Sequence, residues 1–192
     1  PISLAFLKAC TEAGHPQTDD ICGYRQEGFG ILDQTIHEGA RWSSAKGYLD
    51  SVRARSNLTI ETGALVQRVL IDEKVAIGVQ YINRQGEQIS TLACKEVILS
   101  AGAVNSPQIL QLSGIGPAKL LKSHGIKVVV DTPVGENLQD HLQIRAVYKV
   151  SGTRTLNTLT NSVFGKAKIG LEYLFKRSGP MSMSPSQLGA FT

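Results

Sequence analysis

The sequence has few of the features that mark membrane, disulfide-rich or metal-binding proteins. No apolar run approaches the roughly eighteen residues that a membrane-spanning helix requires. The three cysteines, Cys10, Cys22 and Cys94, are odd in number and far apart. They therefore suggest neither a zinc-ligand spacing nor a disulfide framework, and we expect no metal site and a reducing compartment.

Clustered positive charge and a targeting signal are also missing. The net charge is +4, but the basic residues are scattered, for example Arg53, Arg55, Lys119, Lys122, Lys166, Lys168, Lys176 and Arg177. A nucleic-acid footprint requires clustering, so we expect solvated helix faces and no nucleic-acid partner. The opening segment PISLAFLKACTEAG has no basic leader and no cleavage site, which makes it a poor signal peptide. The expected location is cytoplasmic, or peripheral to the inner face of a membrane.

Hydrophobic spacing and turn residues predict an α/β (α+β) fold. A long loop rich in Gly and Asp, with one short strand at 30–35, separates the first two helices. The predicted helices span residues 3–13, 44–56, 104–112, 117–124 and 161–179. The predicted strands span residues 30–35, 57–62, 64–72, 75–83, 97–99, 126–131 and 143–150. The strands between 57 and 99 are joined by short turns and are typical of a meander that ends in a hydrophobic strand. The last helix carries an apolar stripe of Val163, Ala167, Leu171 and Leu174.

The stretch SAGAVNSPQILQLSGIG, from Ser100 to Gly116, follows the predicted strand 97–99. A buried strand that leads through small residues into a helix is typical of a ligand-binding turn at the carboxyl edge of an open sheet. Small side chains allow a ring or ribose to approach the backbone, and the helix offers free N–H groups. Ser106-Pro107 is predicted to begin the helix. Spacing alone leaves a second interpretation open, a close-packed strand–helix corner without a ligand.

The same stretch carries a family resemblance. GAVNSPQILQLSGIGP resembles the second signature of the glucose–methanol–choline (GMC) family of FAD-dependent oxidoreductases, in particular its choline and alcohol dehydrogenase branch. Further segments that resemble this family are RWSSAKGYL, NLTIETGALVQRVL, GIKVVVDTPVGENLQDH and LEYLFKRSGPMSMSPSQLGAF. The resemblance covers nearly the whole chain. It implies part of an FAD-binding, Rossmann-like domain over residues 1–140 and the beginning of a substrate-binding domain over 141–192.

The resemblance also implies roles for individual residues. The strand around Val66 is similar to the family segment whose backbone lies against the adenine of FAD. The turn of Ser100, Ala101 and Gly102 resembles the segment that closes the adenosine side of the flavin site. Asn137, Asp140 and His141 match the segment that marks the passage into the substrate domain. Family catalysis is attributed to a later histidine, so we interpret His141 as structural and expect no catalytic residue in this sequence.

The implied reaction is oxidation of a primary alcohol, choline-like or aliphatic, to an aldehyde, with hydride transfer to the flavin. The electron acceptor stays open between oxygen, a quinone and another carrier. Choline recognition needs a carboxylate or an aromatic cage around the quaternary ammonium. Candidates are Tyr148, Phe164, Glu172, Tyr173 and Phe175, although core packing or a solvated face is favoured for each.

Two parts of the family pattern are missing from the sequence. The G-x-G-x-x-G loop that holds the FAD pyrophosphate does not occur, and Gly28-Phe29-Gly30 is no substitute because it lacks a suitably placed third glycine. The region with the catalytic histidine is absent too. We therefore expect an internal segment of a longer enzyme that is inactive alone and does not retain FAD, with exposed strand edges that favour a homodimer. The alternative is a non-catalytic nucleotide-binding or scaffold module of the same fold.

Overall fold

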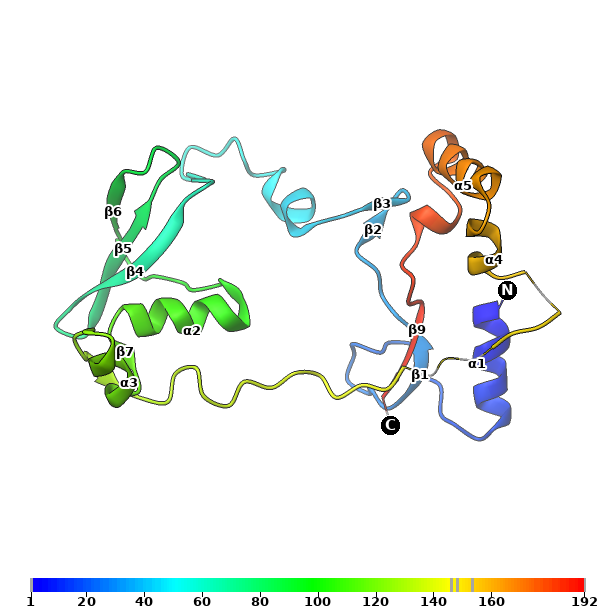
Figure 1. Ribbon diagram of the computed structural model, residues 1–192, viewed down its shortest axis with the longest axis horizontal. Coiled ribbons are helices and arrows are strands. Elements are labelled where there is room, and N and C mark those ends of the chain that lie inside the picture. The colour runs from blue at the N-terminus through cyan, green and yellow to red at the C-terminus, as the bar shows by residue number, and fades with distance from the viewer. Residues whose placement is uncertain (1, 146, 148, 153, 192) are drawn as a thin grey trace. The chain divides into compact units, whose positions relative to one another are not determined.

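The computed structural model describes residues 2–145, 147, 149–152 and 154–191, and the chain divides into two compact units. One unit combines Pro1–Leu58 with Val147–Thr192, and the other is Thr59–Ala146. Figure 1 shows helices and strands in both, which confirms the predicted α/β class. Within the described residues, no helix combines the length and the apolar character that crossing a bilayer demands.

The first unit begins with helix α1 (Ile2–Glu12), which confirms the helix predicted at 3–13. Leu7 and Cys10 form its buried face, and the Phe6 ring packs edge-on against Phe29 with 6.0 Å between centroids. Phe29 belongs to strand β1 (Gly28–Ile31), which pairs antiparallel with β9 (Leu188–Phe191). The α1 helix thus covers a two-stranded sheet built from the two ends of the chain.

The long loop holds more structure than the sequence predicted. In place of one strand at 30–35, the chain forms β1 and then a hairpin of β2 (Ile36–His37) and β3 (Ala40–Arg41). Its two-residue turn, Glu38-Gly39, has positive φ at both positions, 48° and 70°, as a type I′ turn requires. The helix predicted over 44–56 shortens to a π-helical turn, η1 (Ala45–Leu49), followed by irregular turns.

The C-terminal part of this unit contains α4 (Leu156–Thr160), α5 (Val163–Lys176) and the 3₁₀ turn η2 (Pro180–Ser182). The α5 helix confirms the prediction at 161–179, while α4 was missed. The first turn of α5 is capped by the Ser162 hydroxyl, which accepts from the Gly165 N–H at 2.9 Å. The α5 helix ends at Arg177, which has φ of 50°. The predicted apolar stripe exists but is exposed: Val163, Ala167, Leu171 and Leu174 all face solvent.

The second unit is built on an antiparallel meander, as predicted. Strands β4 (Leu65–Asp72), β5 (Val75–Ile82) and β6 (Gln88–Leu92) pair in the order β4-β5-β6. The strand predicted at 57–62 is irregular, because no strand lies beside it in the part of the chain that is described.

The signature stretch follows the meander as helix α2 (Gly102–Leu112), strand β7 (Ile115–Gly116) and helix α3 (Ala118–Ser123). Figure 1 shows α2 beside the meander, with β7 and α3 at its C-terminal end. The helix begins at Gly102, not at Ser106-Pro107 as predicted, so Pro107 lies inside it. The strand predicted at 126–131 reduces to β8 (Val130–Asp131), which pairs parallel to β7 and is exposed.

Two further predicted strands are corrected. Residues 97–99 pair with no strand among the described residues, yet their exposure alternates as in a strand. Val97 and Leu99 line an apolar cavity of about 140 Å³ with residues of β4 and α2, while Ile98 is 75% exposed. The described residues of 143–150 form no strand, and residues 146 and 148 lie outside the described part. Both segments have strand-like sequences, but in the described part of the chain no neighbouring strand completes their hydrogen bonds.

Candidate functional site

The turn before α2 is the first element of the candidate site. Ala101 precedes the helix with φ of −87°, and Gly102 opens it with φ of +88°, a conformation that costs a side-chain residue about 1–2 kcal/mol. The Ala101 N–H donates to Ser106 Oγ at 2.9 Å, so a side chain from inside the helix closes the turn. Ser100, Ala101 and Gly102 are all exposed.

The start of α2 has room for a ligand. A Cβ atom added to Gly102 would meet no heavy atom within 4 Å. The N-cap residue Ala101 makes no side-chain capping bond, and among the described residues no acidic residue occupies the first turn of the helix. The first N–H groups of a helix have no partner within the helix, and the helix dipole favours oxygen-bearing, negatively charged groups there. The turn therefore presents an open, electrically suited surface.

Val66 lies near the beginning of β4 and is half-buried. Its pairing with Tyr81 is followed by a register shift before Arg68, so Gln67 forms a β-bulge. A bulge redirects the backbone locally and increases the twist. The strand that carries Val66 packs directly against α2, so the two predicted contact segments belong to one packed unit.

Ser113 fastens α2 to β4. Its hydroxyl accepts from the Val69 N–H at 2.8 Å and donates to the Ile109 carbonyl at 2.6 Å. Ser113 and Val69 are both buried, and β5 is the one strand that pairs with β4 among the described residues. The Ser113 hydroxyl therefore satisfies a buried backbone donor on the other edge of β4. This serine fixes the C-terminal end of α2 on the strand that carries Val66.

Gly114, directly after Ser113, allows a close backbone contact. Gly114 has φ of +86°, and its Cα faces the Lys127 carbonyl so closely that a Cβ would collide with it. The Gly114 carbonyl accepts from the Val129 N–H at 2.8 Å, and β7 pairs with β8 directly after it. Asp131 then caps α3, because its Oδ1 accepts from the Ala118 N–H at 2.8 Å. The second half of the signature thus joins α2 to residues 127–131.

A family described as GMC oxidoreductase matches residues 1–143. The chain belongs to the GMC oxidoreductase family. It spans about a third of the length of the curated relatives it matches.

Curated relatives of this GMC oxidoreductase chain are named choline dehydrogenases. The human protein named "Choline dehydrogenase, mitochondrial" is 47% identical over 192 residues, which cover 100% of this chain and 32% of that protein. The "Oxygen-dependent choline dehydrogenase" of Pseudomonas fluorescens (strain SBW25) is 45% identical, over 100% of this chain and 34% of that protein.

Solved structures agree with the family. An FAD-dependent oxidoreductase from Chaetomium thermophilum matches with a TM-score of 0.81 at 33% identity, over 98% of this chain and 34% of that one. Formate oxidase of Aspergillus oryzae RIB40 matches with a TM-score of 0.77 at 29% identity, over 97% of this chain and 33% of that one.

The turn before α2 has two features that suit a nucleotide cofactor such as the FAD of the family. The open glycine at position 102 leaves space for a ring or sugar, and the uncapped start of α2 suits ribose or phosphate oxygens. The residues offer no counterpart of the G-x-G-x-x-G loop, which the sequence lacks. These residues therefore offer open space and free N–H groups but no pyrophosphate loop.

The other predicted residues of this GMC oxidoreductase chain do not gather at the turn. Asn137, Asp140 and His141 lie in an exposed loop, where Asp140 Oδ1 accepts from the His141 backbone N–H at 2.8 Å. Asp140 therefore binds the main chain and not the imidazole ring. Among the described residues, no group of three or more His, Cys, Asp or Glu side chains is arranged to hold a metal ion.

The candidates for a choline cage are spread along α5. Phe164 and Phe175 lie three turns apart, about 16 Å along the helix, and both are exposed. The Tyr173 ring is stacked by the Arg177 guanidinium at 4.9 Å, and Glu172 accepts from the Ser178 hydroxyl at 3.2 Å. Tyr148 lies outside the described residues. The described candidates thus form no common cage in this unit.

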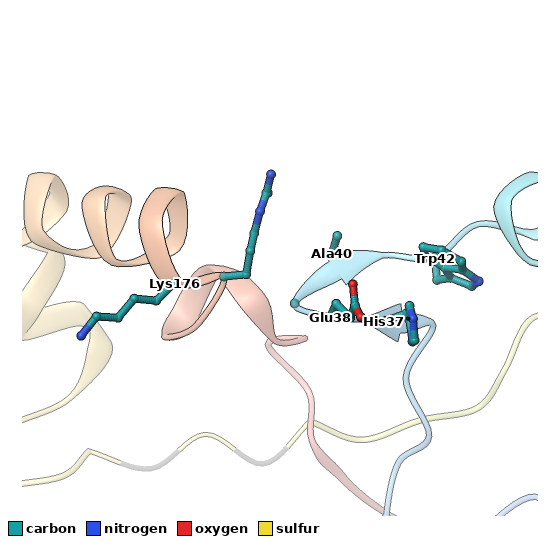
Figure 2. A pocket seen from close by; sticks show the side chains of 7 residues that line it. His37, Glu38, Ala40, Trp42 and Lys176 are labelled. Carbon is teal, nitrogen blue, oxygen red and sulfur yellow. Dashed lines mark ion pairs between the residues drawn. The ribbon is translucent and has the colours of Figure 1, made fainter.

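A hollow in the first unit was not predicted from the sequence. It has a volume of about 510 Å³ and is lined by His37, Glu38, Gly39, Ala40, Trp42, Lys176 and Arg177. The rings of His37 and Trp42 lie 4.7 Å apart, and Lys46 Nζ lies 5.7 Å from the Trp42 ring. Figure 2 shows the Lys176 side chain pointing away from His37 and Glu38. The aromatic and cationic groups at the hollow thus contact each other or point away from it.

Proposed function

We propose that the whole protein is an FAD-dependent oxidoreductase that oxidises a primary alcohol to an aldehyde. Membership of the GMC oxidoreductase family and the names of the choline dehydrogenases at 45–47% identity support this proposal. Choline is the favoured substrate because the curated relatives carry its name, with an aliphatic alcohol as the other candidate. The electron acceptor is oxygen, a quinone or another carrier.

Within that enzyme, this chain supplies the adenosine side of the cofactor site. Val66, Ser100, Ala101 and Gly102 are the residues proposed to contact FAD. The observation that carries the proposal is Gly102, which combines positive φ, an uncapped helix start and free space where a Cβ would lie. Bound FAD supplies the hydride-accepting flavin, and these residues hold its distant end.

The chain is proposed to contain parts of two domains. Residues 1–140 belong to the FAD-binding domain and 141–192 begin the substrate-binding domain, which the family match over residues 1–143 supports. The chain alone is proposed to be inactive, because its sequence has no phosphate loop to hold the FAD pyrophosphate. Exposed apolar residues such as Ile98 and Phe164 support a role as one segment of a larger fold.

The proposed site is tested by a pair of glycine variants in the whole protein. Gly102→Ala and Gly86→Ala replace glycines with φ of +88° and +81°, and neither added Cβ would meet an atom within 4 Å. Both variants carry a similar backbone cost, about 1–2 kcal/mol. Only the Cβ at position 102 would enter the space proposed for the adenosine.

We expect Gly102→Ala to weaken FAD binding to the apoprotein at least tenfold and Gly86→Ala to leave it unchanged within twofold. Equal affinities for FAD in the two variants would contradict the site. Turnover of the unmodified protein on choline and on a straight-chain primary alcohol then tests the reaction. The alternative of a non-catalytic module predicts bound nucleotide without turnover on any alcohol.

A further inference from the structure

Ser106 makes an unusual hydrogen bond. It lies in the second turn of α2, where a serine hydroxyl commonly bonds back to the carbonyl four residues earlier. Here its Oγ instead accepts from the N–H of Ala101, the residue that precedes the helix, at 2.9 Å. Ser106 is half-buried, and the turn that it holds is exposed. A side chain of the helix interior thus fixes the conformation of the segment before the helix.

The neighbouring proline makes this bond more important. Pro107 has no N–H, so the bond that residue 107 would donate to the Ala103 carbonyl does not form. The first turn of α2 therefore holds one hydrogen bond fewer than a regular helix start. The bond between Ala101 and Ser106 restrains the turn from the outside and keeps Gly102 in its positive-φ conformation.

We propose that Ser106 is a positioning residue for the adenosine end of FAD. Its hydroxyl occupies the Ala101 N–H and holds the turn, so the following N–H groups at the start of α2 stay directed at the ligand. The inference rests on the proposed function, because it assumes that this turn contacts FAD. The hydroxyl itself contacts the protein backbone and acts on the cofactor through the turn.

The experiment uses apoprotein of the whole enzyme and three variants. Ser106→Ala removes the acceptor, Ser106→Thr retains a hydroxyl, and Ser123→Ala is the control. Ser123 donates to the Leu120 carbonyl at 2.7 Å on the exposed face of α3, so its loss removes a comparable bond away from the turn. FAD affinity is measured by quenching of flavin fluorescence, and ADP affinity by displacement of FAD. Hydrogen exchange at the Ala101 amide reports the turn directly.

Ser106→Ala is expected to weaken FAD and ADP binding by the same factor, about three- to tenfold, the usual effect of one hydrogen bond. Exchange at the Ala101 amide is expected to rise by a similar factor. Ser106→Thr is expected to stay within twofold of the unmodified protein, and Ser123→Ala to change neither affinity. If Ser106→Ala does not fold, Ser106→Cys, whose sulfur is a weak acceptor, takes its place.

The proposal would be overturned by unchanged affinities in Ser106→Ala, by a loss for FAD that ADP does not share, or by a threonine variant as weak as the alanine variant. A loss shared by FAD and ADP but also seen in Ser123→Ala would show general destabilisation and equally overturn it. Failure of the unmodified apoprotein to bind FAD is a different result, since it contradicts the proposed function itself.

Discussion

Replacing Ser113 with alanine tests how α2 is fastened to the meander. The substitution removes two hydrogen bonds, the one accepted from the Val69 N–H at 2.8 Å and the one donated to the Ile109 carbonyl at 2.6 Å. Ile109 keeps its intrahelical partner, because the Ser113 N–H also donates to its carbonyl at 3.0 Å. The Val69 N–H, in contrast, stays buried and loses its acceptor.

A buried donor without a partner costs about 1–3 kcal/mol. The same free energy corresponds to a rise of about 5- to 150-fold in the opening equilibrium that governs amide exchange. Hydrogen exchange at the Val69 amide measures this locally, so the result does not depend on two-state unfolding of the whole protein. We expect the protection factor of the Val69 amide to decrease by about 5- to 150-fold in Ser113→Ala.

Ser90→Ala provides the matched control in the same unit. Ser90 accepts from Gln80 Nε2 at 3.5 Å on the exposed face of the meander, so its loss should leave Val69 protection unchanged within twofold. A change of less than twofold in Ser113→Ala would refute the reasoning, because it would mean that the serine does not satisfy the Val69 donor.

Two other predictions concern the second half of the signature and the chain by itself. Gly114→Ala is expected to lower the free energy of unfolding by about 2–5 kcal/mol, since it combines φ of +86° with a Cβ facing the Lys127 carbonyl. Gly86→Ala, strained but open, should cost only about 1–2 kcal/mol, and equal urea midpoints for the two variants would contradict the packing argument. The purified 192-residue chain is expected to be colourless and to show no alcohol-dependent dye reduction, because it has no phosphate loop. A yellow preparation with a flavin absorbance band would disprove that expectation.

The elements that could be predicted from the sequence are those whose packing or hydrogen-bond partners lie close along the chain. The α1 helix buries Leu7 and Cys10 at helical spacing, and the β4-β5-β6 meander closes its hydrogen bonds through short turns. Residues 97–99 and 143–150 have strand-like composition but lack a neighbouring strand among the described residues. Strand propensity is satisfied only by pairing, so these segments could not be placed from their own residues.

The candidate site was predicted in part for a similar reason. Small residues between an apolar run and a helix indicated the turn at Ser100, Ala101 and Gly102. The bonds of Ser106 and Ser113 could not be predicted, because each joins a side chain to a backbone N–H that only the folded chain brings within reach. The bond from Val69 to Ser113 joins residues 44 positions apart. The start of α2 was placed too late because Ser-Pro is a common helix beginning, whereas Gly102 turns the chain four residues earlier.

Anaerobic mixing of the purified whole protein with choline tests the central claim most directly. We expect a yellow protein whose flavin absorbance band bleaches as choline is converted to its aldehyde, with FAD released on denaturation. A whole protein without flavin, or a flavin band that neither choline nor any other primary alcohol bleaches, would contradict it.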